Sequence, residues 1–400
     1  MSEFTKHNLL RVEQLEKLFY GILKGEKLGQ LVRENQKVID SCVPADVIAV
    51  VDKLVLEKVP MEELKKGINK LLNLLHKTLS EYPYYPPEHE SYLGCLVENN
   101  RLMEERLLAI KPLFRGVNKQ ADNESIKKEL LEKLVELEKF GNYYTIKENL
   151  LFPVIEKYIT EYRCLQVMWS FHDDIRRNLK SAIKMLKGEI TTDMKLFNRW
   201  VGDLFFNMYA VKFREERILF PLVQKEIEAV VLNALLTESM EIGFPFFQPK
   251  NVLPDENIAP VSDDMEIDLE TGNLSVEQIK LLFNHLPVDI TFVDENNKVK
   301  YFSTPKKRIF PRTKSVIGRD VHNCHPPESM HVVEQIVESF RNGEKDVASF
   351  WINMKGNMLL IQYFAVRDEN GNYKGVVEVS QEISEIQNLE GENRLLDWES

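Results

Sequence analysis

The chain has 400 residues and a formal net charge of -11, with 44% hydrophobic and 29% charged residues. This length suffices for two or three domains, each with a core of its own. The acidic balance argues against nucleic acid and against an acidic membrane surface as partners, because both require a basic face.

Several other features of the sequence exclude classes of protein. No apolar run approaches the roughly eighteen residues of a membrane span, and the first residues form an amphipathic pattern unlike a signal peptide. The four cysteines stand alone without a C-x-x-C pair, as expected in a reducing compartment. From these features we expect a cytoplasmic protein. Because no phosphate loop, nucleophile elbow or zinc-protease motif occurs, we expect that it is not an enzyme.

Residues 1–82 are predicted to form an all-helical module. Apolar residues recur at helical spacing up to Gly25, and Pro44 and Pro60 each suit the first turn of a new helix. The stretch 57–64, EKVPMEEL, resembles a helical module of unknown function. The nearest histidine to the position where that module carries one is His76, and Leu71 occupies the position itself.

A repeated cassette dominates residues 83–242. Glu148 begins the stretch ENLLFP and Glu216 begins ERILFP, each within a long segment of helical periodicity. The cassettes resemble the second and fourth helices of hemerythrin-like four-helix bundles. That resemblance implies two inward glutamates at a di-iron centre, each about one turn after a histidine. Tyrosines 143 and 144, Val211 and Lys212 stand where those histidines are expected.

The run 167–176, VMWSFHDDIR, resembles the third helix of the same family, with His172 at the place of a metal ligand. Two interpretations stay open: a ligand to non-haem iron, or a buried histidine satisfied by a glutamate. The candidate metal set is Glu148, His172 and Glu216, with His76 or His89. Because imidazoles are missing, we predict no stoichiometric di-iron, and we expect aromatic side chains to fill its space: Tyr143, Tyr144, Phe205 and Phe206.

Residues 243–274 are rich in proline and acids and are predicted to be a linker. After it, a capping box at Ser275, five strand-like segments and one longer helix are expected within residues 275–385. Their order resembles a PAS domain, as do the motifs IGR at 317–319 and QEIS at 381–384. A terminal helix is predicted over residues 386–400.

The cluster His322, Cys324 and His325 is the densest set of soft ligands in the chain. The resemblance places a PAS ligand between the sheet and these helices, so the cluster predicts either a haem or metal site or an ordinary structural segment. We expect Cys324 to pack beside the sheet rather than act as a redox switch.

The sequence therefore predicts a multidomain α plus α+β protein: a helical module, a degenerate hemerythrin-like bundle, and a PAS domain. We expect a sensor or regulatory protein that acts through an unidentified protein partner, with a small-molecule PAS ligand and a homodimer as further expectations. The alternatives are a non-haem iron protein that binds oxygen or nitric oxide or handles iron, and a haem-binding PAS sensor. No cofactor at all is also an open outcome.

Overall fold

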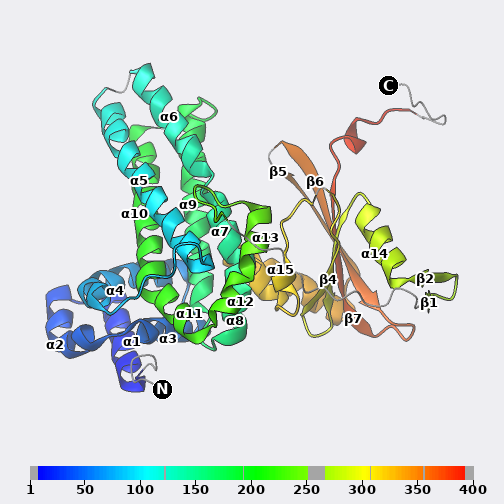
Figure 1. Ribbon diagram of the computed structural model, residues 1–400, viewed down its shortest axis with the longest axis horizontal. Helices are drawn as coiled ribbons and strands as arrows, with labels where there is room; N and C mark the ends of the chain where they lie inside the picture. Colours follow the sequence, from blue (N-terminus) through cyan, green and yellow to red (C-terminus); the bar gives the residue numbers. More distant parts are fainter. Residues whose placement is uncertain are drawn as a thin grey trace. The chain divides into compact units, whose positions relative to one another are not determined.

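The computed structural model describes residues 8–120, 123–191, 193–250, 266–306, 308–354 and 356–391. The chain divides into two compact units, Met1–Glu256 and Asn257–Ser400 (Figure 1). Each unit has its own hydrophobic core. The predicted order, a helical region followed by an antiparallel five-stranded sheet, is therefore confirmed.

The first unit begins with four helices: α1 (Leu9–Leu23), α2 (Leu28–Ser41), α3 (Pro44–Leu56) and α4 (Met61–Glu81). Pro44 is the first residue of α3, where its missing N–H costs nothing, and Pro60 precedes α4. Helix α3 is mostly apolar and is buried along most of its length. The carboxylate of Asp46 accepts from the backbone N–H of Val43 and pairs with Arg11 at 2.7 Å, which ties α3 to α1.

Four further helices pack in a ring. They are α5 (Tyr92–Lys119), α6 (Glu124–Glu138), α9 (Cys164–Leu186) and α10 (Met194–Arg214). Helix α5 contacts α6, α6 contacts α9, α9 contacts α10, and α10 contacts α5 (Figure 1). The remaining helical segments extend or connect these helices: α7 (Gly141–Ile146), α8 (Phe152–Tyr158), α11 (Phe220–Glu226), α12 (Ala229–Asn233) and α13 (Leu235–Ile242).

Both cassettes lie on helices, as predicted, but the local winding is π rather than α. The π segments are η1 (Lys147–Leu151) and η2 (Glu215–Leu219), and in each the N–H five residues on donates to the first carbonyl. A proline follows one residue later in both repeats, at 153 and 221. Because a proline inside a helix crowds the carbonyl of the preceding turn, the wider π turn relieves this contact.

The second unit contains a five-stranded antiparallel sheet of order β4-β3-β7-β6-β5. Its strands are β3 (Asp289–Asp294), β4 (Val299–Phe302), β5 (Val347–Met354), β6 (Asn357–Arg367) and β7 (Tyr373–Glu382). Helix α14 (Val276–His285) starts at the capping box of Ser275 and Gln278, as predicted. Helix α15 (Pro327–Arg341) lies between β4 and β5 in the sequence. Short 3-10 turns span Lys314–Val316, Val321–Cys324 and Ile386–Asn388.

Two expectations about irregular segments need correction. The predicted linker 243–274 contains most of a hairpin, β1 (Glu266–Asp268) with β2 (Asn273–Ser275), and residues 251–265 of it lie outside the described residues. Of the predicted terminal helix, the described part holds only the turn Ile386–Asn388, and residues 392–400 lie outside it. The hairpin was missed because three-residue strands show too little alternation to detect.

Candidate functional site

A buried ion pair joins the two π segments at the centre of the helical ring. Lys147 from η1 donates to Glu215 from η2, and both side chains are fully buried. Two further groups donate hydrogen bonds to the Glu215 carboxylate. Tyr143 Oη donates to Oε2 at 2.5 Å, and Asn100 Nδ2 donates to the same oxygen at 2.8 Å. Buried charges are tolerated when they are paired and fully hydrogen-bonded, and Glu215 meets both conditions.

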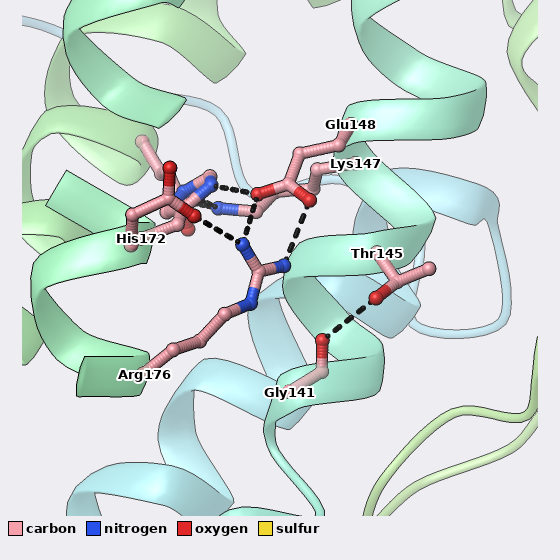
Figure 2. A network of polar contacts seen from close by, with 8 residues as sticks. Gly141, Thr145, Lys147, Glu148, His172 and Arg176 are labelled. Atoms are coloured by element: carbon pink, nitrogen blue, oxygen red, sulfur yellow. Dashed lines mark hydrogen bonds and ion pairs between the residues drawn. The ribbon is translucent and has the colours of Figure 1, made fainter. Parts of the chain in front are cut away.

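His172 and Arg176 of α9, together with Glu148 of η1, extend this polar network (Figure 2). His172 Nε2 lies 3.0 Å from Lys147 Nζ, and His172 Nδ1 lies 2.8 Å from Glu148 Oε1. The guanidinium of Arg176 donates to both carboxylate oxygens of Glu148, from Nη1 to Oε1 at 2.9 Å and from Nη2 to Oε2 at 2.7 Å. Because Glu148 can only accept, Nδ1 carries the proton and Nε2 accepts from the lysine. Arg176 also donates to Asp173 Oδ1 at 3.0 Å, so the neutral imidazole lies among two cations and three carboxylates.

Burial and the neighbouring cations determine the protonation of this group. Burial lowers the pKa of the Lys147 ammonium well below its ordinary value, and the Glu148 carboxylate opposes that shift. Burial also lowers the pKa of His172 well below its ordinary value, and the charges of Lys147 and Arg176 lower it further. Tyr144 stacks on the imidazole with ring centroids 4.3 Å apart, which fixes the ring plane.

The depressed pKa of His172 predicts a pH-dependent stability. Above about pH 6.5 the imidazole is neutral in both the folded and the unfolded chain. Below that pH the unfolded chain binds a proton that the folded protein does not, so stability falls by up to about 1.4 kcal/mol per pH unit. Urea denaturation between pH 7.5 and 5 measures this slope. A His172→Gln variant is expected to show a shallower slope, and equal slopes would contradict the assignment.

The structure brings together only part of the predicted metal set. Glu148 and His172 are in contact, whereas Glu216 pairs with Lys212 at 3.0 Å. His76 stacks on Phe213 with centroids 4.6 Å apart, and His89 packs edge-on against Phe247. Within the described residues, no three side chains among His, Cys, Asp and Glu converge as metal ligands would. The prediction about di-iron remains a prediction.

The aromatic filling of the centre is partly as expected. Tyr143 and Tyr144 are buried beside Phe140, with Tyr143 stacked on its ring and Tyr144 edge-on to it. Phe205 packs half-buried against the core, but Phe206 is 47% exposed, so the prediction for Phe206 is wrong. It lies on the outer side of α10 because its neighbours in sequence already supply the inward face.

Lys147 and Glu215 were missed by the motif comparison. Each lies directly before the glutamate that the cassette aligns, at the same position of the repeat, and their charges are opposite. The opposite charges of these two residues, at equivalent positions of the two repeats, could have indicated the ion pair.

In the second unit, the predicted ligand cluster does not converge on one point. His322 Nδ1 lies 2.6 Å from Asp320 Oδ1, a contact that raises the pKa of His322. His325 Nδ1 lies 2.9 Å from the carbonyl of Val321, and burial lowers the pKa of His325. Cys324 packs against the core of this unit, as expected.

Only His325 of the cluster lines the cavity between the sheet and α15. This cavity has a volume of about 20 Å³, and its other polar lining comes from Tyr363 on β6 and Glu378 on β7. Arg312 Nη2 pairs with Glu378 at 3.2 Å. Such a volume is about what one water molecule requires, far below the space of drug-sized ligands or a haem.

Comparison with known proteins agrees with this fold. Residues 279–384 match the family model described as a PAS domain. Among solved structures, the chain is similar to a C-terminal domain from Streptococcus mutans, with 36% identity over 32% of this chain and 98% of that chain and a TM-score of 0.31. It is also similar to a PAS domain of a protein from Colwellia psychrerythraea, with 15% identity over 27% of this chain and 97% of that chain and a TM-score of 0.22.

A third similar structure is a sensory box sensor histidine kinase from Vibrio cholerae, with 12% identity over 26% of this chain and 86% of that chain and a TM-score of 0.21. No match is found among curated proteins. The second unit therefore contains an antiparallel α+β domain that matches the PAS family model over residues 279–384.

Across the part of the chain that the structure describes, every helix is too short or too polar to cross a membrane.

Proposed function

We propose that this protein is a cytoplasmic sensor or regulatory protein without a catalytic output of its own, which signals through contacts with another protein. The observation that carries the proposal is the PAS domain at residues 279–384. Its cavity offers three polar groups, from His325, Tyr363 and Glu378, on otherwise apolar walls. These polar groups suit only a very small ligand, since a volume of about 20 Å³ is about what one water molecule requires.

Exposed apolar side chains on the PAS domain support a protein-contact role. Trp351 on the edge strand β5 is 70% exposed, and Phe350 and Ile352 beside it are also exposed. On α14, Leu281 and Leu282 face solvent. Apolar groups gathered on an edge strand are typical of partner or dimer surfaces, since proteins otherwise avoid exposing them there.

For the helical unit, we infer a hemerythrin-like bundle whose metal has been replaced by a lysine. Support comes from the ring of four helices, from the paired cassettes and from the position of Lys147 between Glu215 and His172. The residues do not fit iron, because the lone pair of His172 Nε2 that a metal would need accepts from Lys147. An ammonium group supplies the positive charge between the carboxylates.

The absence of iron can be tested directly. Full-length protein is purified without oxygen, reconstituted with ferrous iron, and analysed for metal content and for its absorption spectrum. We expect well under one iron per chain and no ligand-to-metal charge-transfer band, because the imidazole and carboxylate that could bind iron are already paired. Two irons per chain would make the helical unit the sensing centre and reject the inference.

Sensing by the PAS domain has its own test. Residues 266–400 expressed alone and the full chain are screened side by side for thermal stabilisation by haem, by flavin and by a library of small molecules. We expect stabilisation of both samples only by a ligand of very few heavy atoms and by neither cofactor, since the cavity of about 20 Å³ is too small for haem or flavin. Ligands that stabilise the full chain but not the PAS domain would assign sensing to the helical unit instead.

A further inference from the structure

Arg214, the last residue of α10, is a buried cation with little to neutralise it. Its side chain is 6% exposed, and only Nη2 has a hydrogen-bond partner, Oδ1 of Asn69 on α4. Its Nε and Nη1 atoms are buried without a partner. The guanidinium carbon lies 4.1 Å from the centroid of the Phe171 ring, which provides a cation–π contact but no negative charge.

Other buried cations of the helical unit differ in this respect. Lys65 pairs with Asp174 at 2.9 Å, and Lys147 pairs with Glu215. Arg214 has no carboxylate within ion-pair distance among the residues that the structure describes. Burial lowers the pKa of Arg214 to about 9, and no neighbouring charge offsets that shift. A guanidinium nevertheless stays protonated at neutral pH, so the site holds an uncompensated positive charge.

The same guanidinium lines a pocket whose other walls are apolar. Helices α3 and α4 contribute Val47, Val51 and Ile68, and α9 and η2 contribute Phe171 and Ile218. The pocket has a volume of about 50 Å³, several times the roughly 10–15 Å³ that one water needs. Cys164, at the start of α9, is the most exposed of its lining residues.

We propose that this pocket binds a short-chain monocarboxylic acid of about two to five carbons. The carboxylate would accept hydrogen bonds from the guanidinium nitrogens that have no partner in the chain, which supplies the missing negative charge. The hydrocarbon chain would lie against Ile68, Phe171 and Ile218. A phosphate or a sugar acid would leave polar groups unpaired on the apolar walls, so the pocket selects an acid with an apolar tail.

The first experiment is a ligand series on the full-length protein at constant ionic strength. Binding of chloride, acetate, butyrate, 3-methylbutanoate and butanamide is measured by calorimetry and by thermal shift. We expect affinity to rise about fourfold for each added CH2 group until the pocket is full, and we expect butanamide to bind at least tenfold more weakly than butyrate. Equal binding of chloride and butyrate, or no binding of any acid, would overturn the proposal.

Matched variants locate the site. Arg214→Met is expected to lower butyrate affinity about 10–100-fold, whereas Arg199→Met, an exposed arginine on the same helix, should leave it unchanged. Val51→Leu keeps Arg214 but narrows the pocket, so it should weaken 3-methylbutanoate more than acetate. If Arg214→Met does not fold, the Val51→Leu variant alone tests whether the acid binds in this pocket. Butyrate binding that survives both substitutions would reject the pocket as its site.

Discussion

Replacing Lys147 with methionine is expected to lower the free energy of unfolding of the helical unit by about 3–5 kcal/mol. The substitution removes the cation but leaves Glu215 fully buried, with only the donors Tyr143 and Asn100 to satisfy it. It also removes the hydrogen bond that His172 Nε2 accepts. The cost comes from the orphaned carboxylate and not from lost volume, since methionine and lysine have similar shapes.

A double variant separates the charge from the packing. Lys147→Met combined with Glu215→Leu removes both ions and keeps an apolar centre, so we expect it to recover most of the lost stability. Lys157→Met on the surface of α8 serves as the control and should change stability by less than about 0.5 kcal/mol. Denaturant unfolding monitored by helical circular dichroism gives all four values. A single variant as stable as the wild type, or a double variant no better than the single, would contradict the ion-pair assignment.

The ion pair also explains why the two repeats are not identical. A symmetric pair of lysines or of glutamates at positions 147 and 215 would place like charges together in a dry interior. One lysine and one glutamate instead attract, and they join η1 to η2 across the helical ring. The two repeats therefore share the backbone geometry of a π turn, and their side chains at positions 147 and 215 are complementary in charge.

Local signals were sufficient to predict most of the elements. Pro44, Pro60 and the capping box at Ser275 mark helix starts because each satisfies or avoids a free N–H. The strands from Asp289 to Glu382 are rich in β-branched and aromatic residues and are bounded by turn residues, so their order could be recognised without coordinates.

The polar centre could not be predicted from spacing, because the π turns alter it. A π segment contains one extra residue per turn, so a glutamate placed inward by counting along an α-helix is displaced around the axis. In η2 the structure directs Glu215 into the centre while Glu216 lies beside Lys212. In η1 the equivalent glutamate, Glu148, stays in the buried group. Arg214 was missed for a related reason: its isolation from carboxylates depends on which helices surround it, and these are distant in sequence.

Gly375→Ala is expected to destabilise the PAS domain by about 3 kcal/mol or more. Gly375 lies in β7 opposite Asp294 of β3, with φ of 141°, a conformation that side chains disfavour. A Cβ atom there would come within 2.1 Å of the carbonyl oxygen of Val293, which is backbone and cannot rotate away. Strands β3 and β7 would have to separate.

Separation of these strands would also disrupt the proposed sensing cavity, because Val293, Val376 and Glu378 all line it. Hydrogen exchange followed by mass spectrometry checks both effects: amides of β3 and β7 should lose protection, while those of the helical unit serve as the internal reference. Lys374→Ala, at the adjacent residue of the same strand, is the matched control and should leave protection unchanged. If Gly375→Ala retains wild-type protection in β3 and β7, the close approach of these strands at Val293 is not a constraint on the fold.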